Sequence, residues 1–571
     1  MVTNVTGNQT QSPTFSRNDL TMSFLASRSL RYYCVATNIS KQSSTTLPAN
    51  QQNSPTFQTY VGLDVHCKLN VNSKLFSRSS NNFYAKANQC VSWFDAALPG
   101  TLPAVNRRCL ELAIKSALAL NCQINPICVF DREHIFEPSY PSGFRLVQSR
   151  EPIASNGLLN VPIKVDKTCY IKTIELKSIH LEEDSGHVFV SHLDQCNCID
   201  LNSRGLPLIK FSFKSTIMTA LESSRSVNQL IQILERIGAF TPKIEERALS
   251  IDVKIKLVSE NTSDYAVTIK GINSCSSLGT YIANEFGRQK YLIKTNNPMS
   301  ADQTYQALTS GGMKKIKTED IDPRSIINLS IPPFRFDSTV QNSDENVSLS
   351  IEKIAAELPS LPDSERSHLV DHCNLNLLQA TKLIENDYAQ VVIKMVSNDP
   401  SICSNHLYNF TMEVLNAAIV KTNSEINQLY NFIDNLVECF NLLKSKTISR
   451  QNATEMIVSC LQGDKRSPDE LIIANEWSII EDDKIITDFC KDVIKVHCTY
   501  AFFVKRGDKK FLKNLIKRVK IASNHRIPEE KIMQKLDSLI SNIDKAALAI
   551  FTTNRNKKSK NRPNLFLDEN Q

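Results

Sequence analysis

The sequence predicts an α+β fold: a mixed domain of strands and helices comes first and all-helical domains follow. Residues 61–69 and 251–257 alternate apolar with polar side chains, the period of a half-buried strand. Residues 107–120 instead repeat apolar residues at helical spacing, and helical periodicity dominates after about residue 345. At 571 residues the chain exceeds what one hydrophobic core usually serves, so we expect about three domains.

The first 57 residues have the composition of a leader. They are rich in Ser, Thr, Asn and Gln and contain one acid, Asp19, so they cannot build a core. Residues 22–33 combine apolar residues, serines and arginines without an acid, which is typical of mitochondrial transit peptides. We expect residues 1–57 to be a transit peptide and disordered leader, with Met22 as an alternative start. An ordinary disordered tail is the competing interpretation.

The mixed domain is expected over residues 58–344. In its first strand Asp64 and His66 fall on the same, polar face. The helix at 107–120 is predicted by an apolar stripe of Leu110, Ala113, Ile114, Ala117 and Leu118. Ile331-Pro332-Pro333, followed by the polar residues 338–348, indicates a linker.

A cluster of charge follows the apolar-rich run 169–179. His180, Glu182, Glu183 and Asp184 lie within five residues, where like charges repel unless a cation or hydrogen bonds compensate. One interpretation is a solvated strand end, where water screens the repulsion. The other is a site for Mg²⁺, which takes oxygen ligands from one or two carboxylates and leaves the rest to water and substrate.

The helical part carries one clear stripe and one basic run. Ala453, Met456, Ile457, Cys460 and Leu461 form the stripe, and Gly463 ends that helix. Between residues 505 and 520 Asp508 is the only acid, and it suits an N-cap. A helix here would pack its apolar arc and leave a cationic face for nucleic-acid phosphates. The residues expected to contact these phosphates are Arg506, Lys509, Lys510, Lys513, Lys517 and Lys520. A solvated helix face is the alternative.

Composition limits which partners, compartments and metal sites are expected for this chain. A net charge of +7 argues only for tolerance of an anionic partner, and no apolar run is long enough to span a bilayer. Sixteen cysteines show no repeated Cys-x-x-Cys frame, which favours free thiols in a reducing compartment. Cys196 and Cys198 are the only close pair, and no structural zinc is expected.

Segments from about residue 58 to 545 carry a resemblance. They include VGLDVHCKL at 61–69, SKLF at 73–76, LPGTLP at 98–103, HLEED at 180–184, PLI at 207–209 and LPSLPD at 358–363, with further matches at 117–125, 130–132, 245–246, 269–270 and 273–274. In this order the chain resembles the B-subunit family of glutamyl-tRNA(Gln) amidotransferases, in its mitochondrial form. The resemblance implies a cradle domain at 58–344, a helical domain at 345–432, a YqeY-like helical tail domain at 433–550 and a basic disordered tail at 551–571.

The resemblance also implies an activity and a place in the cell. The family amidates glutamate mischarged on tRNA(Gln), using ATP and Mg²⁺ to phosphorylate the side-chain carboxylate before ammonia displaces the phosphate. Ammonia comes from glutamine through the amidase subunit of the complex, which a small third subunit completes. The substrate would be mischarged Glu-tRNA(Gln), the product Gln-tRNA(Gln), and the location the mitochondrial matrix.

For the site, the resemblance implies catalytic roles for His66, Glu182, Glu183 and Asp184. His66 and Glu183 would be metal ligands. The third family ligand, a glutamate after PLI, is replaced by Lys210.

Other departures cluster on the same pocket. Glu133 and Ser142 stand where lysines line the phosphate end, Ser203-Arg204 stands for Arg-Ala, and Arg247 and Thr268 also differ from the pattern. A pocket with rearranged charge and a worn, catalytically degenerate scaffold that only binds tRNA both remain open. A stand-alone kinase is disfavoured because no glycine-rich phosphate loop is present.

Overall fold

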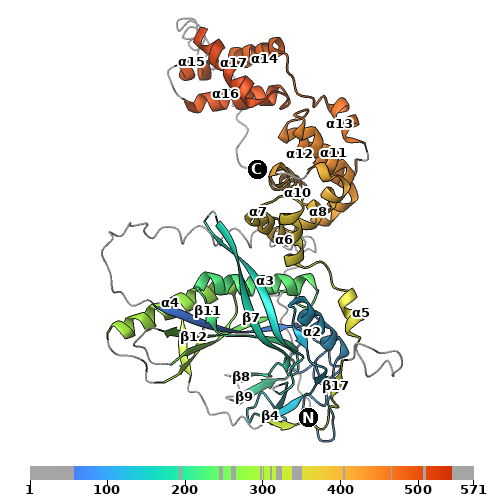
Figure 1. Cartoon of the computed structure of the whole chain (residues 1–571), viewed down its shortest axis with the longest axis vertical. Helices are drawn as coiled ribbons and strands as arrows, with labels where there is room; N and C mark the ends of the chain where they lie inside the picture. The colour runs from blue at the N-terminus through green and yellow to red at the C-terminus, as the bar shows by residue number, and fades with distance from the viewer. Residues whose placement is uncertain are drawn as a thin grey trace, which may run out of the picture. The chain divides into compact units, whose positions relative to one another are not determined.

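The computed structural model describes residues 57–542 except 149, 167, 192–195, 243–247, 259–264, 296–298, 300, 309–311, 317–324, 337–349, 403–404, 465 and 506–508. The predicted transit peptide, the C-terminal basic tail and most of the predicted linker therefore lie outside the described residues. What is described is α+β, as predicted, with sheets in the N-terminal part and helices in the C-terminal part (Figure 1). Contacts divide the chain into two compact units: residues up to 159 with 174–354, and residues 160–173 with 355 onward.

The first unit is built on a ten-stranded sheet in the order β15-β14-β13-β12-β1-β10-β7-β6-β2, with β11 also paired to β1. The strands are β1 Gln58–Lys68, β2 Gln123–Ile124, β6 Ala154–Val165, β7 Thr168–Glu183, β10 Pro207–Phe213, β11 Thr216–Ile217, β12 Leu249–Val258, β13 Val267–Ile272, β14 Gln303–Ala307 and β15 Met313–Ile316. The alternation predicted at 61–69 and 251–257 is confirmed by β1 and β12, which pair antiparallel in the centre of the sheet.

Three helices accompany the sheet: α2 Arg107–Ala119, α3 Ala220–Arg236 and α4 Cys275–Lys294 (Figure 1). The helix predicted at 107–120 is confirmed, and Asn106 caps it by accepting a hydrogen bond from the Arg108 backbone N–H. Thr219 and Glu222 form a capping box that starts α3. Against this helical layer the apolar face of β1 is buried, so the opposite face of the sheet is left to polar side chains.

Smaller sheets lie beside the large one. Three strands join in the order β16-β4-β5, two pair as β17-β3, and two form the hairpin β8-β9. Their bounds are β3 Ile127–Cys128, β4 Asp131–His134, β5 Phe144–Val147, β8 His187–Ser191, β9 Cys196–Asp200, β16 Ser325–Ile327 and β17 Phe334–Arg335. The hairpin β4-β5 brings residue 133 opposite residue 145.

The second unit is helical apart from the segment 160–173. Its helices are α5 Ile351–Ala356 at the junction of the units, α6 Pro362–Asp371, α7 Leu377–Glu385, α8 Ala389–Asn398, α9 Asn405–Asn409, α10 Asn416–Thr422, α11 Ile433–Lys444, α12 Arg450–Leu461, α13 Pro468–Asn475, α14 Asp483–Val496, α15 Cys498–Lys505, α16 Lys509–Ala522 and α17 Glu529–Asn542. A π-helical turn spans Phe410–Leu415, and 3₁₀ turns span Pro400–Ile402 and Ile426–Phe432. The stripe predicted in α12 is confirmed, because Ala453, Met456, Ile457 and Cys460 are buried.

The packing of the second unit corrects one predicted boundary. We expected a division at 432/433, but one hydrophobic cluster runs through that point from Leu369 to Leu471. A second cluster runs from Ile486 to Ile540. The tail core therefore begins after residue 471, because α11 to α13 bury their apolar faces with the preceding helices.

Candidate functional site

The candidate site lies on the polar face of the sheet, where three neighbouring strands align their side chains. His66 of β1 is in register with Lys210 of β10, and Lys210 is in register with His180 of β7. Side chains in register on adjacent strands point to the same face. The predicted pairing of Asp64 and His66 on one face is therefore confirmed, and Lys210 lies between β1 and β7 on that face.

Four charged or polar side chains form one cluster there. His66 Nδ1 lies 3.3 Å from Glu182 Oε2, and Lys210 Nζ lies 3.5 Å from Asp64 Oδ2 and 3.8 Å from Glu182 Oε1. Glu182 is thus shared between an imidazole and an ammonium. Asp64 and Glu182 thus offset the positive charge of Lys210, which stands where the family pattern has a glutamate.

The surroundings keep Glu182 ionised. Burial alone would raise its pKa, but the hydrogen bond with His66 and the charges of Lys210 and Arg145 lower the pKa to about 2. A carboxyl whose pKa is lower in the folded chain stabilises it above the unfolded value, about 4.3. That contribution is lost as the pH falls from there towards about 2.

Glu183, which the resemblance implies as a metal ligand, does not join this cluster. Its Oε2 lies 2.6 Å from Arg204 Nη1, and both side chains are almost fully buried. Its Oε1 accepts a hydrogen bond of 2.8 Å from the Leu146 backbone N–H. Strand alternation explains the difference, because Glu183 follows Leu181 on the apolar face of β7 while Glu182 follows His180 on the polar face. Glu182, not Glu183, is therefore the carboxylate of β7 that lies beside His66 and Lys210.

His180 and Asp184 have supporting positions. His180 Nδ1 lies 2.8 Å from the Gln148 carbonyl oxygen and its Nε2 lies 2.7 Å from Ser178 Oγ. Burial lowers the pKa of His180, which fits a neutral ring that donates from Nδ1 and accepts at Nε2. Burial also raises the pKa of Asp184, whose Oδ1 accepts from the Ser185 N–H. The structure places no contact between Asp184 and Glu182.

Glu133 and Ser142 stand where the family pattern has the lysines of the phosphate end, and each forms its own contacts. Glu133 of β4 accepts a 2.6 Å hydrogen bond from Arg145 Nε on β5. Ser142 donates to the Phe144 carbonyl oxygen, and Arg204 Nη2 lies 3.4 Å from Ser142 Oγ. The charge near Ser142 is thus supplied by Arg204, a residue that the sequence marked only as a departure from the family pattern.

Two further charged groups were missed from the sequence. The charge of Arg145 lowers the pKa of Glu182. The sequence did not predict this role, because the nine residues between β4 and β5 lack the two-residue turn that marks a hairpin, so the pairing of these strands could not be foreseen. Lys74 is fully buried and donates a 3.0 Å hydrogen bond to Asp95 Oδ2 and one of 3.2 Å to the Leu201 carbonyl oxygen. In the sequence, Lys74 was noted only as part of the SKLF segment that carries the family resemblance.

The cluster does not fit a protein-bound divalent cation. Within the described part of the chain, no group of three or more His, Cys, Asp or Glu side chains could hold a metal ion. Asp64, His66 and Glu182 have the right donor atoms, but the Lys210 ammonium lies among them. At about 4 Å an ammonium and a divalent ion repel by several kcal/mol at an intermediate dielectric.

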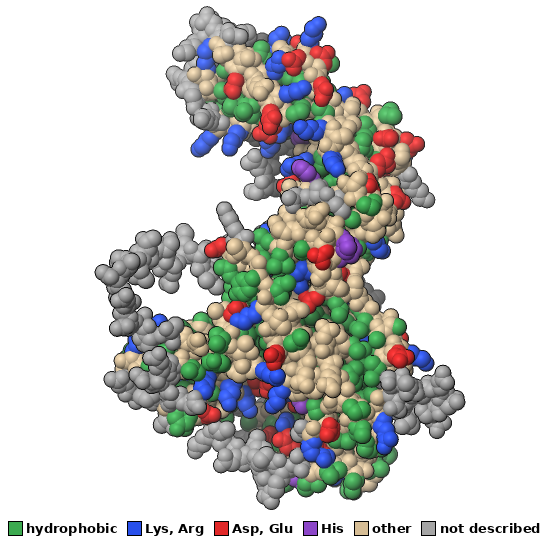
Figure 2. All heavy atoms as spheres, in the orientation of Figure 1, with side chains coloured by type: hydrophobic (Ala, Val, Ile, Leu, Met, Phe, Trp, Pro, Cys, Tyr) green, Lys and Arg blue, Asp and Glu red, His purple; other side chains and the backbone are tan. Residues whose placement is uncertain are grey.

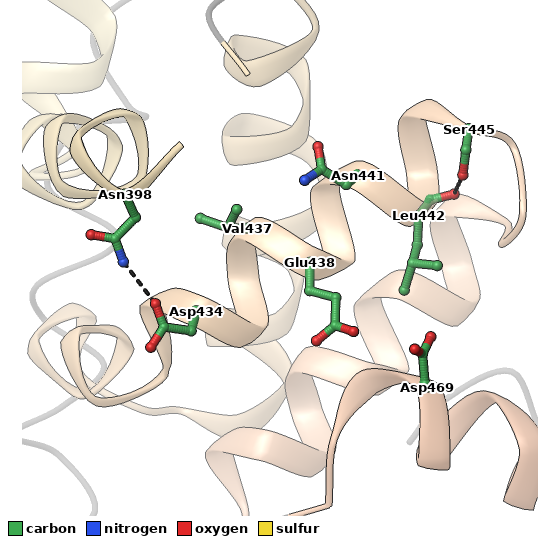
Figure 3. A pocket seen from close by; sticks show the side chains of 8 residues that line it. All are labelled: Asn398, Asp434, Val437, Glu438, Asn441, Leu442, Ser445 and Asp469. Atoms are coloured by element: carbon green, nitrogen blue, oxygen red, sulfur yellow. Dashed lines mark hydrogen bonds between the residues drawn. The ribbon is translucent and has the colours of Figure 1, made fainter. Parts of the chain in front are cut away.

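An open pocket of the helical unit is no substitute for this site. It is lined by Asn398, Asp434, Val437, Glu438, Asn441, Leu442, Ser445 and Asp469 (Figure 3). Burial, then the nearby Asp469, raises the pKa of Glu438. Three carboxylates line this pocket, Asp434 and Glu438 from α11 and Asp469 from α13, and their charge repels phosphate, so the pocket suits neither nucleotide nor tRNA backbone.

The predicted basic helix exists as α16. Leu515, Ile516 and Val519 are buried in the tail core, whereas Lys510, Lys513, Lys517 and Arg518 are exposed. Lys520 pairs with Glu529 at 2.5 Å, so its charge is partly offset. Arg506 lies outside the described residues, and Lys509 begins the helix. In Figure 2, Lys and Arg side chains stand out along the edge of the tail where Figure 1 draws α16.

Among the described residues, no helix is both long and apolar enough to cross a bilayer. Comparison with known proteins gives a more specific result. The model of the GatB/GatE catalytic domain matches residues 59–342, and that of the GatB domain matches residues 388–540.

Individual relatives match nearly end to end. The B subunit of the mitochondrial glutamyl-tRNA(Gln) amidotransferase of Aedes aegypti is 30% identical over 508 residues, which cover 86% of this chain and 94% of the relative. The mitochondrial B subunit of Homo sapiens is 28% identical over 494 residues, with 84% and 88% covered. The B subunit of the aspartyl/glutamyl-tRNA(Asn/Gln) amidotransferase of Thermosynechococcus vestitus is 28% identical over 504 residues, with 84% and 97% covered. The chain therefore belongs to the family of glutamyl-tRNA(Gln) amidotransferase B subunits.

Proposed function

We propose that this chain is the subunit of a mitochondrial amidotransferase that converts Glu-tRNA(Gln) into Gln-tRNA(Gln). The observation that carries the proposal is the match of both the catalytic and the tail domains, in order, to B subunits over 94% of a relative's length. We infer that it works with an amidase subunit, which supplies ammonia, and with a small third subunit.

The proposed chemistry has two steps. The glutamate side-chain carboxylate attacks the terminal phosphorus of ATP, which forms an acyl phosphate and releases ADP. Ammonia then attacks the acyl carbon and phosphate leaves, so a poor electrophile becomes a reactive one. Positive groups near the transferring phosphoryl group stabilise the charge that develops on it. Arg145 and Lys210, whose charges both lower the pKa of Glu182, are the cations that can serve in this way.

ATP and Mg²⁺ remain the proposed cofactors. Mg²⁺ is commonly bound through substrate phosphates and water rather than by an all-protein cage. We therefore propose that it arrives with the nucleotide. In this proposal Mg²⁺ is held by the phosphates of ATP, whereas Lys210 stays with Asp64 and Glu182 on the sheet.

The test is reconstitution of the full chain with its amidase partner. Purified complex is mixed with Glu-tRNA(Gln), glutamine and either ATP or a non-hydrolysable analogue, and the aminoacyl group is identified after release. We expect glutamine on the tRNA only with ATP, and one ADP for each amide formed. Glutamine hydrolysis and tRNA binding without amide formation would contradict the proposal.

A second candidate is a tRNA-binding scaffold that has lost phosphoryl transfer. The observation in its favour is Lys210, which engages Asp64 and Glu182 where the family pattern has a carboxylate. The reconstitution separates the two candidates, because a scaffold binds Glu-tRNA(Gln) and the amidase partner yet forms no amide.

For tRNA binding we propose backbone contact by the exposed face of α16. Replacing Lys513 and Lys517 with Ala removes two exposed charges that have no acid within one turn, so binding should weaken and the slope of log K against log salt should flatten by about one to two. Filter binding over a range of salt measures both quantities. The matched control replaces Lys491 and Lys495, which pair with Asp488 and Asp492 on α14. Equal salt-dependence slopes for the two double variants would mean that the charged face of α16 is only solvated and does not bind tRNA.

For location we propose the mitochondrial matrix, since residues 22–45 are basic, hydroxylated and poor in acids. Amino-terminal sequencing of the mature protein should find a start downstream of Met22. An intact Met1 or Met22 on protein purified from the organelle would contradict cleavage.

A further inference from the structure

The strand β10 presents one cation at the centre of the polar face. Lys210 has a histidine in register on each side, His66 on β1 and His180 on β7. Its Nζ lies within 4 Å of two carboxylates on those same two strands, Asp64 and Glu182. The ammonium therefore bridges β1 and β7 across β10.

This arrangement uses the donor atoms that a divalent ion would need. Asp64 and Glu182 each offer an oxygen to Lys210, and the other oxygen of Glu182 faces His66. The Lys210 side chain is about three-quarters buried, so water screens it only in part. A divalent ion entering the cluster would have to displace the ammonium from both carboxylates.

We propose that Lys210 is the resident cation of this site, built into the chain in place of a protein-held divalent metal. The ammonium offsets one of the two negative charges of Asp64 and Glu182 and links β1 to β7 across β10. No ion needs to be loaded for the cluster to form. The inference concerns ion binding by the full chain alone, so it can fail or hold whether or not the amidotransferase assignment is correct.

The test is Mn²⁺ binding by the purified full chain, without nucleotide or tRNA, followed by electron paramagnetic resonance. Lys210→Glu replaces the ammonium with a carboxylate beside Asp64, His66 and Glu182. We expect this variant to bind one Mn²⁺ at least tenfold more tightly than the wild type. The control is Lys254→Glu, which makes the same charge change on the same face but lies in register with Gly62 instead of His66.

A second variant removes the charge without adding a ligand. Lys210→Met leaves Asp64, His66 and Glu182 without their cation, so its melting temperature should fall and Mn²⁺ should restore part of the loss. Mn²⁺ should leave the wild-type melting temperature unchanged, and circular dichroism verifies that each variant is folded. The proposal is overturned if the wild type binds Mn²⁺ as tightly as Lys210→Glu, or if Lys210→Glu binds no better than Lys254→Glu.

Discussion

Replacing Arg204 with Met is expected to lower the free energy of unfolding by about 3–5 kcal/mol, the scale for leaving one partner of a buried ion pair uncompensated. The pair is 3% and 0% exposed, with its two atoms 2.6 Å apart. Urea unfolding of the full chain, followed by a probe in the first unit, measures the loss. The double variant Arg204→Met, Glu183→Leu should recover most of it, because no charge is then left buried. A single variant as stable as the wild type would contradict the ion pair.

The loss should depend on pH in a defined direction. Burial raises the pKa of Glu183, and Arg204 opposes that rise in the wild type. Without Arg204 the folded chain holds the proton more firmly than the unfolded chain, so the native state binds more protons and stability falls as pH rises. The Arg204→Met variant should therefore be least stable at neutral and alkaline pH and recover towards pH 5. A loss that grows on acidification would mean that Glu183 is not the group left uncompensated.

Glu182→Gln is expected to reduce ATP-dependent amidation on the order of 100-fold while leaving the affinity for tRNA unchanged. The amide keeps the shape of the side chain but removes the charge that holds His66 and Lys210, and losing one preorganised polar group at a reacting centre has an effect of this size. Single-turnover amidation and filter binding, with the same purified complex, measure the two quantities.

The neighbouring glutamates of β7 supply the controls. Glu175→Gln removes an exposed carboxylate that pairs with Lys214, and it should leave amidation unchanged. Glu183→Gln should act chiefly on stability, since its partner Arg204 is buried. Normal amidation by Glu182→Gln, together with a folded but inactive Glu183→Gln, would return the catalytic role to Glu183.

The polar face of β1 could be predicted because strand periodicity depends only on local sequence. Strand alternation also applies to β7. Ile179 and Leu181 are buried on one face, so His180 and Glu182 lie on the other. The family pattern suggested Glu183 instead. Arg204 could not be placed, because it follows the hairpin β8-β9 and reaches Glu183 only through tertiary contact.

The division of the helical part was also beyond local periodicity. Helices such as α12 and α14 have an apolar stripe, but the stripe does not say which neighbour it packs against. That Leu436 and Leu471 join the earlier helices, while Ile486 starts another core, depends on how the helices are stacked.

The pairing of β1 also has a consequence for the order in which the chain folds. His66 is flanked by Lys210 on one side and by Ser250 on the other, so both neighbours of its strand are far along the sequence. Long-range strand pairing is slow, because the chain loses the entropy of closing a large loop before the stabilising contacts between the strands form. A ribosome that has released only the first 200 residues has therefore exposed a strand with no partner on either edge. Unpaired edges of this kind template aggregation, so this chain should depend on a chaperone until the segment around Ser250 has emerged.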